Sequence, residues 1–154
     1  MKKYQKFVVA LLTMVLCMTA FNPISVGAKE VKTKVYCFYA STADKFQLSN
    51  GKLTIKLDDN YDISLLGDYD KIKNKENNSI DGKKCKSNKM TYKVDKNCKW
   101  RIVSVCDKFS KDGDKTSYKQ VKENIQSTKT DDWDFGVLVY VRGKKIIKVA
   151  ERFS

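Results

Sequence analysis

The stretch FGVLVYVRGKKIIKVA, residues 135–150, decides the fold of this chain. Two runs rich in β-branched residues flank the turn Arg142-Gly143-Lys144-Lys145, which is the pattern of a β-hairpin. Apolar side chains of the first run fall on both faces of the pleat, so we expect a central strand buried on both sides. In the second run Lys148 marks a face that meets water. The hairpin predicts an all-β or β-rich small domain.

The beginning of the chain has the composition of a secretory signal peptide. A basic segment, residues 1–6, precedes an uncharged apolar run, residues 7–21, and Val26-Gly27-Ala28 supplies the small residues that a signal peptidase reads. We expect cleavage after Ala28. The apolar run is shorter than the roughly 20 residues of a transmembrane helix, so we expect no membrane span after cleavage. The protein is predicted to be bacterial and secreted, either extracellular or associated with the cell wall.

The chain is strongly basic. It has 31 Lys and Arg against 18 Asp and Glu, for a formal net charge of +13. Removal of residues 1–28 takes away three lysines and no acid, which leaves +10. For an exported protein, this excess disfavours nucleic acid as a partner and favours anionic wall polymers, acidic glycans or phospholipid head groups. The alternative is scattered, solvated lysine without a common ligand.

Four cysteines remain after the signal peptide: Cys37, Cys85, Cys98 and Cys106. An even number in an exported domain predicts two disulfides. A single strand between Cys98 and Cys106 would separate them by roughly 25 Å, which is too far for a bond between them. Two pairings stay open: Cys37 with Cys106 and Cys85 with Cys98, which we prefer, or Cys37 with Cys98 and Cys85 with Cys106. With no histidine and no C-x-x-C pair, we expect no metal site and no cofactor.

Further strands are indicated wherever apolar and polar residues alternate. The pattern predicts strands within residues 31–40, 53–57, 61–65, 90–94 and 100–106. The second of these ranges is expected to form a hairpin with the third, and residues 95–97 are expected to turn the chain between the fourth and the fifth. The fold expected is an OB-like barrel or compact sandwich of about six to seven antiparallel strands.

One short α-helix and one long loop complete the expected domain. Ser117 and Gln120 form a capping-box pattern before an apolar stripe at helical spacing, which predicts a helix over residues 117–126. Residues 67–89 are polar without a sustained apolar period, so we expect a long mobile loop. Without an internal repeat or an obvious linker, residues 29–154 are expected to form a single domain with one core.

Four segments with strand, turn and helix signals follow one another along the chain: NGKLTI at 50–55, MTYKVDKNCKW at 90–100, SYKQV at 117–121 and VLVYVRGKKIIKV at 137–149. This order resembles the small OB-like β-barrel domains of unknown function in exported and surface-layer-associated bacterial proteins. The resemblance implies a barrel and supplies no catalytic residues. The cysteines, the lysine-rich loop and Trp100 depart from the family's pattern, so a sandwich of different topology stays open.

The sequence does not favour an enzyme. Histidine is absent, which removes the commonest general base and the usual nucleophile triads. The aspartates cluster in loops, where such residues form turns and caps. The segment KDGD at 111–114 resembles part of a calcium loop, but it lacks the ligand spacing and the closing glutamate.

The candidate binding residues are lysines of polar loops and one tryptophan before the last hairpin. An exposed indole among polar groups can stack on a sugar ring, and clustered ammonium groups attract anionic polymers. Trp100, by contrast, is expected in the core. The residues selected are Lys73, Lys75, Lys83, Lys84, Lys86, Trp133, Lys144 and Lys145.

The function predicted from these features is that of an exported, monomeric and non-catalytic binding module. Its expected partner is an anionic cell-wall polymer, a glycan or a protein. The alternative is a secreted inhibitor or effector that acts on a protein target through the disulfide-pinned loop of residues 67–89.

Overall fold

The C-terminal hairpin lies at the centre of the structure. The computed structural model describes residues 30–128 and 135–153, so the predicted signal peptide and Trp133 lie outside the described residues. Strand β8 (Gly136–Arg142) pairs antiparallel with β9 (Lys145–Phe153). Every residue of β8 except Arg142 is buried, which confirms a strand covered on both faces. The prediction for the second run was wrong, because Lys148 of β9 is buried as well.

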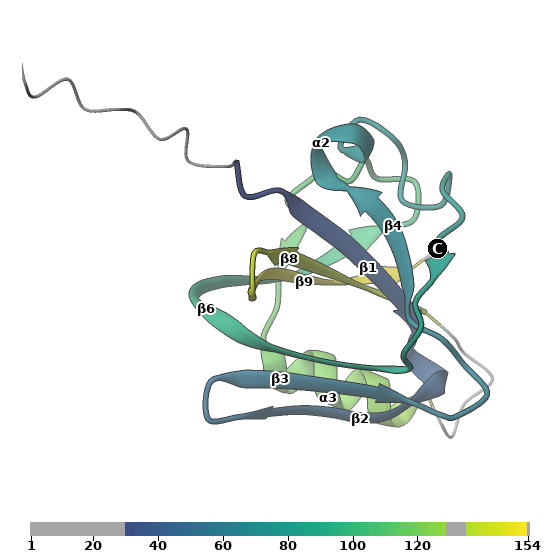
Figure 1. Ribbon diagram of the computed structural model, residues 1–154, viewed down its shortest axis with the longest axis vertical. Coiled ribbons are helices and arrows are strands. Elements are labelled where there is room, and N and C mark those ends of the chain that lie inside the picture. Colours follow the sequence, from purple (N-terminus) through teal and green to yellow (C-terminus); the bar gives the residue numbers. More distant parts are fainter. Residues whose placement is uncertain (1–29, 129–134, 154) are drawn as a thin grey trace, which may run out of the picture. The chain divides into compact units, whose positions relative to one another are not determined.

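The described strands form one sheet that curls into a half-barrel (Figure 1). Its order is β2-β3-β6-β9-β8-β1-β4-β5, with β7 beside β6. The all-β class is therefore confirmed, with nine strands among the described residues rather than six or seven. The remaining strands are β1 (Thr33–Tyr39), β2 (Ala43–Ser49), β3 (Lys52–Leu57), β4 (Ser64–Asp68), β5 (Lys83–Lys84), β6 (Lys89–Ser104) and β7 (Asp114–Lys115).

Strand β6 connects the two halves of the sheet. Its first part pairs with β3, and its second part runs parallel to β9 (Figure 1). The predicted turn at residues 95–97 was wrong, because these residues form a register shift within one long strand. Asp95 accepts a hydrogen bond from the Asn97 backbone N–H at 2.9 Å, as in a turn. This local bond bends the strand, and pairing with β9 resumes at Lys99.

The predicted hairpin between residues 53–57 and 61–65 was also wrong. Strand β3 forms its hairpin with β2, and β4 pairs with β1 instead. The turn between β2 and β3 is Asn50-Gly51, with φ of 49° and 68°. Two successive positive φ angles are the signature of a type I′ turn, whose twist matches the flanking strands. The Asn-Gly signal therefore determined the pairing.

Helix α3 (Tyr118–Ser127) confirms the predicted helix. The side chain of Ser117 accepts a hydrogen bond from the Gln120 backbone N–H at 3.2 Å, which satisfies one of the free donors of the first turn. Val121 and Ile125 are buried in the core. The 3-10 helix η1 (Ala40–Thr42) joins β1 to β2.

The segment of residues 67–89 is held in place rather than forming a free loop. It contains α2 (Tyr69–Ile72) and β5, and it buries Ile72 and Asn77. Backbone hydrogen bonds of 2.8–3.0 Å join its carbonyl and amide groups to residues 107–110. The mobile-loop prediction failed because these partners lie about 30 residues away in the sequence.

Strand β8 separates two hydrophobic clusters. Val137, Val139 and Val141 belong to the first cluster, which also contains the buried residues of β3 and α3. Leu138 and Tyr140 belong to the second, with Phe109 and Ile72. The expectation of a single core was therefore too simple. Half-buried Trp100 packs against the first cluster, as expected.

The four cysteines of the described residues are free thiols, so the two predicted disulfides are not present in the structure. Cys37 packs against the second cluster, whereas Cys85 and Cys98 pack against the first. Cys106 is exposed beyond the end of β6. The side chains are thus distributed over different packing environments, and neither predicted pairing is formed.

Truncation of the central strand should strongly destabilise the protein. Leu138 is fully buried, and Leu138→Ala is expected to lower the free energy of unfolding by about 2–5 kcal/mol. Tyr61 is 51% exposed and serves as the control, since Tyr61→Ala should change stability by less than about 0.5 kcal/mol. Urea unfolding measures both. Equal effects would contradict the central position of β8.

Alkylation of the native protein should distinguish the thiols. Cys106 is exposed and should react with iodoacetamide first. Burial raises the pKa of Cys37, and burial together with Asp95 raises the pKa of Cys98 to about 11, so both should react slowly until the protein unfolds. Peptide mapping by mass spectrometry measures the order. Detection of disulfide-linked peptides in the non-reduced protein would contradict this prediction.

Candidate functional site

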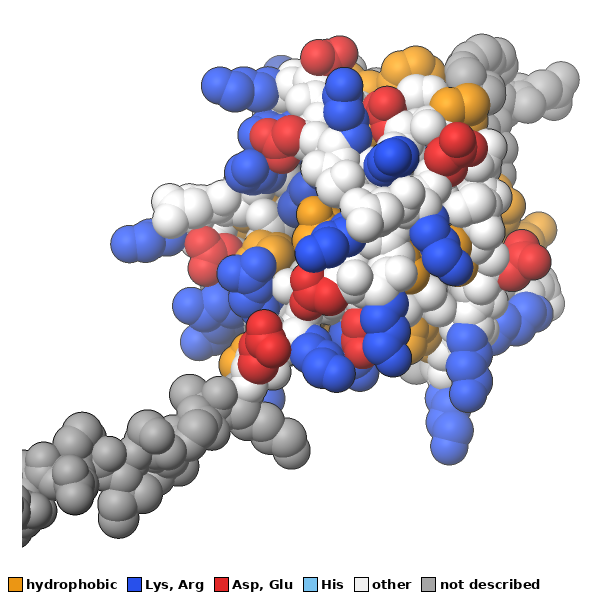
Figure 2. Space-filling view, turned by 90° about the horizontal axis from the view of Figure 1, so that it is seen from above, with side chains coloured by type: hydrophobic (Ala, Val, Ile, Leu, Met, Phe, Trp, Pro, Cys, Tyr) orange, Lys and Arg blue, Asp and Glu red, His pale blue; other side chains and the backbone are white. Residues whose placement is uncertain are grey.

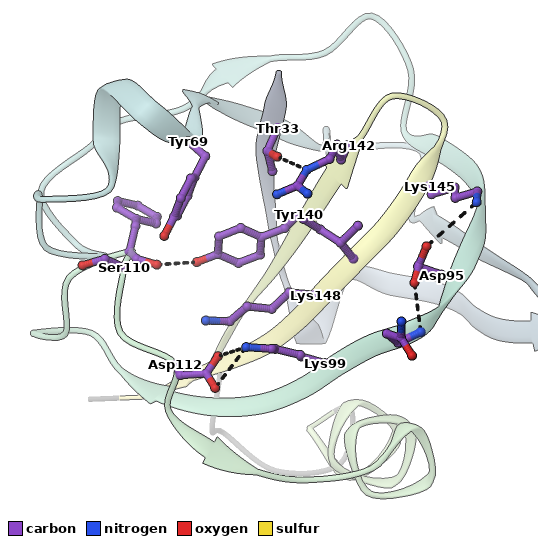
Figure 3. Close-up of a pocket in the computed structure, with 13 residues that line it drawn as sticks. Thr33, Tyr69, Asp95, Lys99, Ser110, Asp112, Tyr140, Arg142, Lys145 and Lys148 are labelled. Atoms are coloured by element: carbon purple, nitrogen blue, oxygen red, sulfur yellow. Dashed lines mark hydrogen bonds and ion pairs between the residues drawn. The ribbon is translucent and has the colours of Figure 1, made fainter. Parts of the chain in front are cut away.

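A cavity of about 690 Å³ opens beside the turn between β8 and β9, and we call it the Arg142 pocket (Figure 3). Strands β1, β6, β8 and β9 contribute to its wall, together with α2 and the loop of residues 105–113. Four basic side chains and two acidic ones line it, beside two tyrosines. The charged residues are Lys99, Arg142, Lys145, Lys148, Asp95 and Asp112.

Arg142 is the last residue of β8 and pairs with Thr33 of β1. Its Nε donates a hydrogen bond to Thr33 Oγ1 at 3.1 Å, which fixes the orientation of the guanidinium (Figure 3). Among the described residues, no carboxylate forms an ion pair with Arg142. The terminal guanidinium nitrogens therefore remain for a ligand.

Two lysines of the pocket, Lys145 beside Arg142 and Lys99 of β6, already have acidic partners. Lys145 Nζ lies 3.9 Å from Asp95, and Lys99 Nζ lies 3.2 Å from Asp112 (Figure 3). Asp112 also accepts from Arg101 at 3.2 Å. Partial burial raises the pKa of Asp112, but the hydrogen bonds and charges of Arg101 and Lys99 outweigh this and hold it below its usual value. The carboxylate stays ionised and partly neutralises this wall.

The two tyrosines give the pocket an aromatic wall. Tyr140 is buried, and its ring meets that of Tyr69 edge to face, with the centroids 6.0 Å apart. The Tyr140 hydroxyl donates to the Phe109 carbonyl at 3.4 Å (Figure 3). Burial, followed by Tyr69, raises the pKa of Tyr140 above its usual value. Tyr140 therefore stays protonated, while the half-buried ring of Tyr69 faces the cavity.

Lys148 is a buried amine in this pocket. Its Nζ donates to the Lys111 carbonyl at 2.7 Å and lies 5.1 Å from the centroid of the Tyr140 ring. Burial lowers the pKa of Lys148 to about 8; Asp112 opposes this effect, and Arg101 and Lys99 add to it. The ammonium is held by a carbonyl and an aromatic face, without a carboxylate in contact among the described residues.

The structure brings one of the sequence-predicted binding lysines into the pocket, namely Lys145. Lys144 is next to it in the exposed turn. Lys83 and Lys84 lie on β5, which is separated from β8 by β1 and β4. Figure 2 shows basic side chains scattered among acidic ones on the face it presents. The other predicted lysines are Lys73, which pairs with Asp70 at 3.7 Å, and the exposed Lys75 and Lys86.

Sequence reasoning missed Arg142, Lys99 and Lys148 as pocket residues. Arg142 was visible in the Arg-Gly-Lys-Lys turn, but nothing local shows that it lacks an acidic partner. Lys148 interrupts an apolar strand, which signalled a water-facing position rather than a covered one. The places of Arg142 and Lys148 in the pocket depend on strand pairing between residues far apart in the sequence.

No family model and no curated protein matches the sequence, and no solved structure matches it. Among residues 30–128 and 135–153, no group of three metal-ligating side chains comes together. No helix in the same part of the chain is long and apolar enough to span a membrane. The geometry of the Arg142 pocket is therefore the basis for assigning a function.

The buried amine should give the protein a specific pH dependence. Lys148 has a pKa of about 8 in the folded state against 10.5 for an ordinary lysine, so the unfolded state holds the proton more tightly between these values. Stability must then rise with pH across this window. Relative to Lys148→Met, the wild type should gain stability from pH 8 to 10, as measured by urea unfolding. Lys84→Met is the control and should run parallel to the wild type; a parallel curve for Lys148→Met would contradict the assignment.

Proposed function

We propose that this protein is an exported, non-catalytic module that binds an anionic ligand in the Arg142 pocket. The ligand class is an acidic glycan or an anionic cell-wall polymer. The observation that carries the proposal is the guanidinium of Arg142, which is oriented by Thr33 and has no carboxylate partner among the described residues. Export is inferred from the signal-peptide composition of residues 1–28.

A guanidinium in this state suits an oxyanion. Its planar fork donates two parallel hydrogen bonds to a carboxylate or phosphate, which adds orientation to charge attraction. The bond from Nε to Thr33 holds the plane in advance, so less side-chain freedom is lost when a ligand binds. Arg142 is thus the expected anchor for the acidic group.

The neighbouring residues suit the remainder of a sugar. The half-buried ring of Tyr69 lines the same cavity and offers an apolar face to a pyranose ring. Lys145 and Asp95 offer a donor and an acceptor at the rim, because their ion pair of 3.9 Å is loose enough to be opened by hydroxyl groups. This combination favours an acidic sugar over a simple inorganic anion.

The lysines outside the pocket have a different role in this proposal. Among the described residues, basic side chains are scattered among acidic ones on the face of Figure 2, and the net charge draws an anionic polymer toward the protein and raises the association rate. The alternative, a secreted inhibitor with a disulfide-pinned loop, has no specific support, because Cys85 is a free thiol.

Replacement of the anchor should separate specific binding from general charge attraction. Arg142→Met should weaken binding of a glycerol-phosphate oligomer or an oligogalacturonate by about ten-fold, the loss expected for one charge-assisted hydrogen-bond pair. Lys84→Met removes the same charge from β5, where Lys84 pairs with Asp62 at 3.6 Å, and should weaken binding less than about two-fold. Isothermal titration calorimetry measures both variants.

Ionic strength provides the second arm of this experiment. Wild-type affinity should fall between about 0.05 M and 0.5 M salt, because screening weakens exposed charge interactions. If Arg142→Met and Lys84→Met lose equal affinity for the oligomers, scattered lysines bind the polymer and the pocket does not. If neither oligomer binds to the wild-type protein, the proposal is overturned.

A further inference from the structure

Lys148 is the feature of the pocket that anion binding does not require. A surface lysine serves as well to attract an anion, yet this one is buried and lies on the wall of the cavity. Among the described residues, it makes one hydrogen bond, to the Lys111 carbonyl at 2.7 Å. An ammonium carries three N–H groups, so two of them have no protein partner there. A nitrogen in this position is open to the cavity on one side.

The position of Lys148 relative to Arg142 follows from strand register. Lys148 pairs directly with Tyr140, and Arg142 lies two residues further along β8, beyond a register shift between Tyr140 and Val141. Both side chains line the same cavity of about 690 Å³. A small ligand with an anionic group at one end can therefore place its other end beside the Lys148 nitrogen.

The surroundings of Lys148 keep a large share of the amine neutral. Arg101 and Lys99 of β6 repel its charge, whereas Asp112 and Asp107 of the loop of residues 105–113 attract it, and the Tyr140 ring covers it from β8. Burial is the dominant influence and lowers the pKa to about 8. At pH 8, the neutral fraction exceeds that of an ordinary lysine by about a hundred-fold. A neutral amine is a nucleophile, and an ammonium is not.

We propose that Lys148 forms a reversible imine with an anionic aldehyde or ketone whose acidic group is held by Arg142. This inference rests on the proposed function of the pocket and specifies its ligand as an acidic compound with a free carbonyl group. The open-chain form of a uronic acid or of a sugar phosphate has this chemistry. Lys148 is then a covalent binding residue.

The step balances without any oxidant or reductant. The lone pair of the neutral Lys148 nitrogen attacks the carbonyl carbon, and a proton moves from nitrogen to the former carbonyl oxygen to give a carbinolamine. The carbon–oxygen bond then breaks, the oxygen leaves as water, and the nitrogen and carbon share a double bond. The net change is amine plus carbonyl to imine plus water, and hydrolysis reverses it.

Pyridoxal 5′-phosphate is a suitable probe, because it carries an aromatic aldehyde and a phosphate. The wild-type protein is incubated with it at pH 8, reduced with borohydride so that any imine becomes a stable secondary amine, and mapped by mass spectrometry. Lys148 should be labelled at least about ten-fold faster than exposed Lys84, since a desolvated lysine reacts with carbonyl groups most readily. Direct mapping of the wild type avoids reliance on a variant that fails to fold.

Two controls assign the selectivity to the pocket. Pyridoxal, which lacks the phosphate, should show a smaller preference for Lys148 over Lys84 than the phosphorylated probe, and Arg142→Met should reduce the preference of the phosphorylated probe to that of pyridoxal. Labelling spread over the exposed lysines without preference for Lys148 would overturn the inference.

Calorimetry with the same probe separates this inference from the proposed function. Binding that depends on Arg142, without a reduced adduct on Lys148, would overturn the imine and leave anion binding in place. If neither oligomer binds in an Arg142-dependent manner, the proposed function itself is overturned. An adduct on Lys148 whose rate advantage depends on both the phosphate and Arg142 supports both.

Discussion

The two-sided burial of β8 is the constraint on which the rest of the structure depends. Its valines at 137, 139 and 141 need cover on one face, and Leu138 and Tyr140 need it on the other. One flat sheet cannot cover both sides of its own central strand. The half-barrel solves this: β6 curves so that β2, β3 and α3 enclose the first face, while α2 and the loop of residues 105–113 enclose the second. The Arg142 pocket forms where this second cover meets the end of β8.

The sequence predicted the parts of this fold that depend on local chemistry. Three signals each act within a few positions of the chain, so the local structure could be predicted from them. They are the alternation in 135–150, the serine before α3 and the turn residues at the β8–β9 connection. Which strands pair with one another could not be predicted in this way. Asn50-Gly51 joined β3 to β2 rather than to the next strand, and Asp95 bent β6 without ending it, because pairing with β9 across about 50 residues outweighed a local turn.

The candidate site was less predictable than the fold, for a related reason. The sequence shows which residues carry charge, but it does not show which charges neutralise one another. Lys145 was predicted as a binding residue and lies at the rim of the pocket, where it forms an ion pair with Asp95. Arg142 is the stronger candidate for an anion anchor. Its position at the end of β8 lets it donate a hydrogen bond to Thr33, and no carboxylate among the described residues forms an ion pair with it. Such a difference arises from register, and composition cannot reveal it.

Lys148 shows how the fold constraint and the chemistry of the pocket are connected. Its neighbour across the strands, Tyr140, must be buried to complete the second cluster, and the cover that buries Tyr140 also covers Lys148. A polar residue that alternation assigned to water is thereby desolvated, which is unfavourable for its charge. Asp112 limits this cost by pairing with Lys99 and Arg101, the two cations that would otherwise repel Lys148 most strongly. A methionine would fill the same space without this penalty. A lysine there is explained if its nitrogen acts on a ligand.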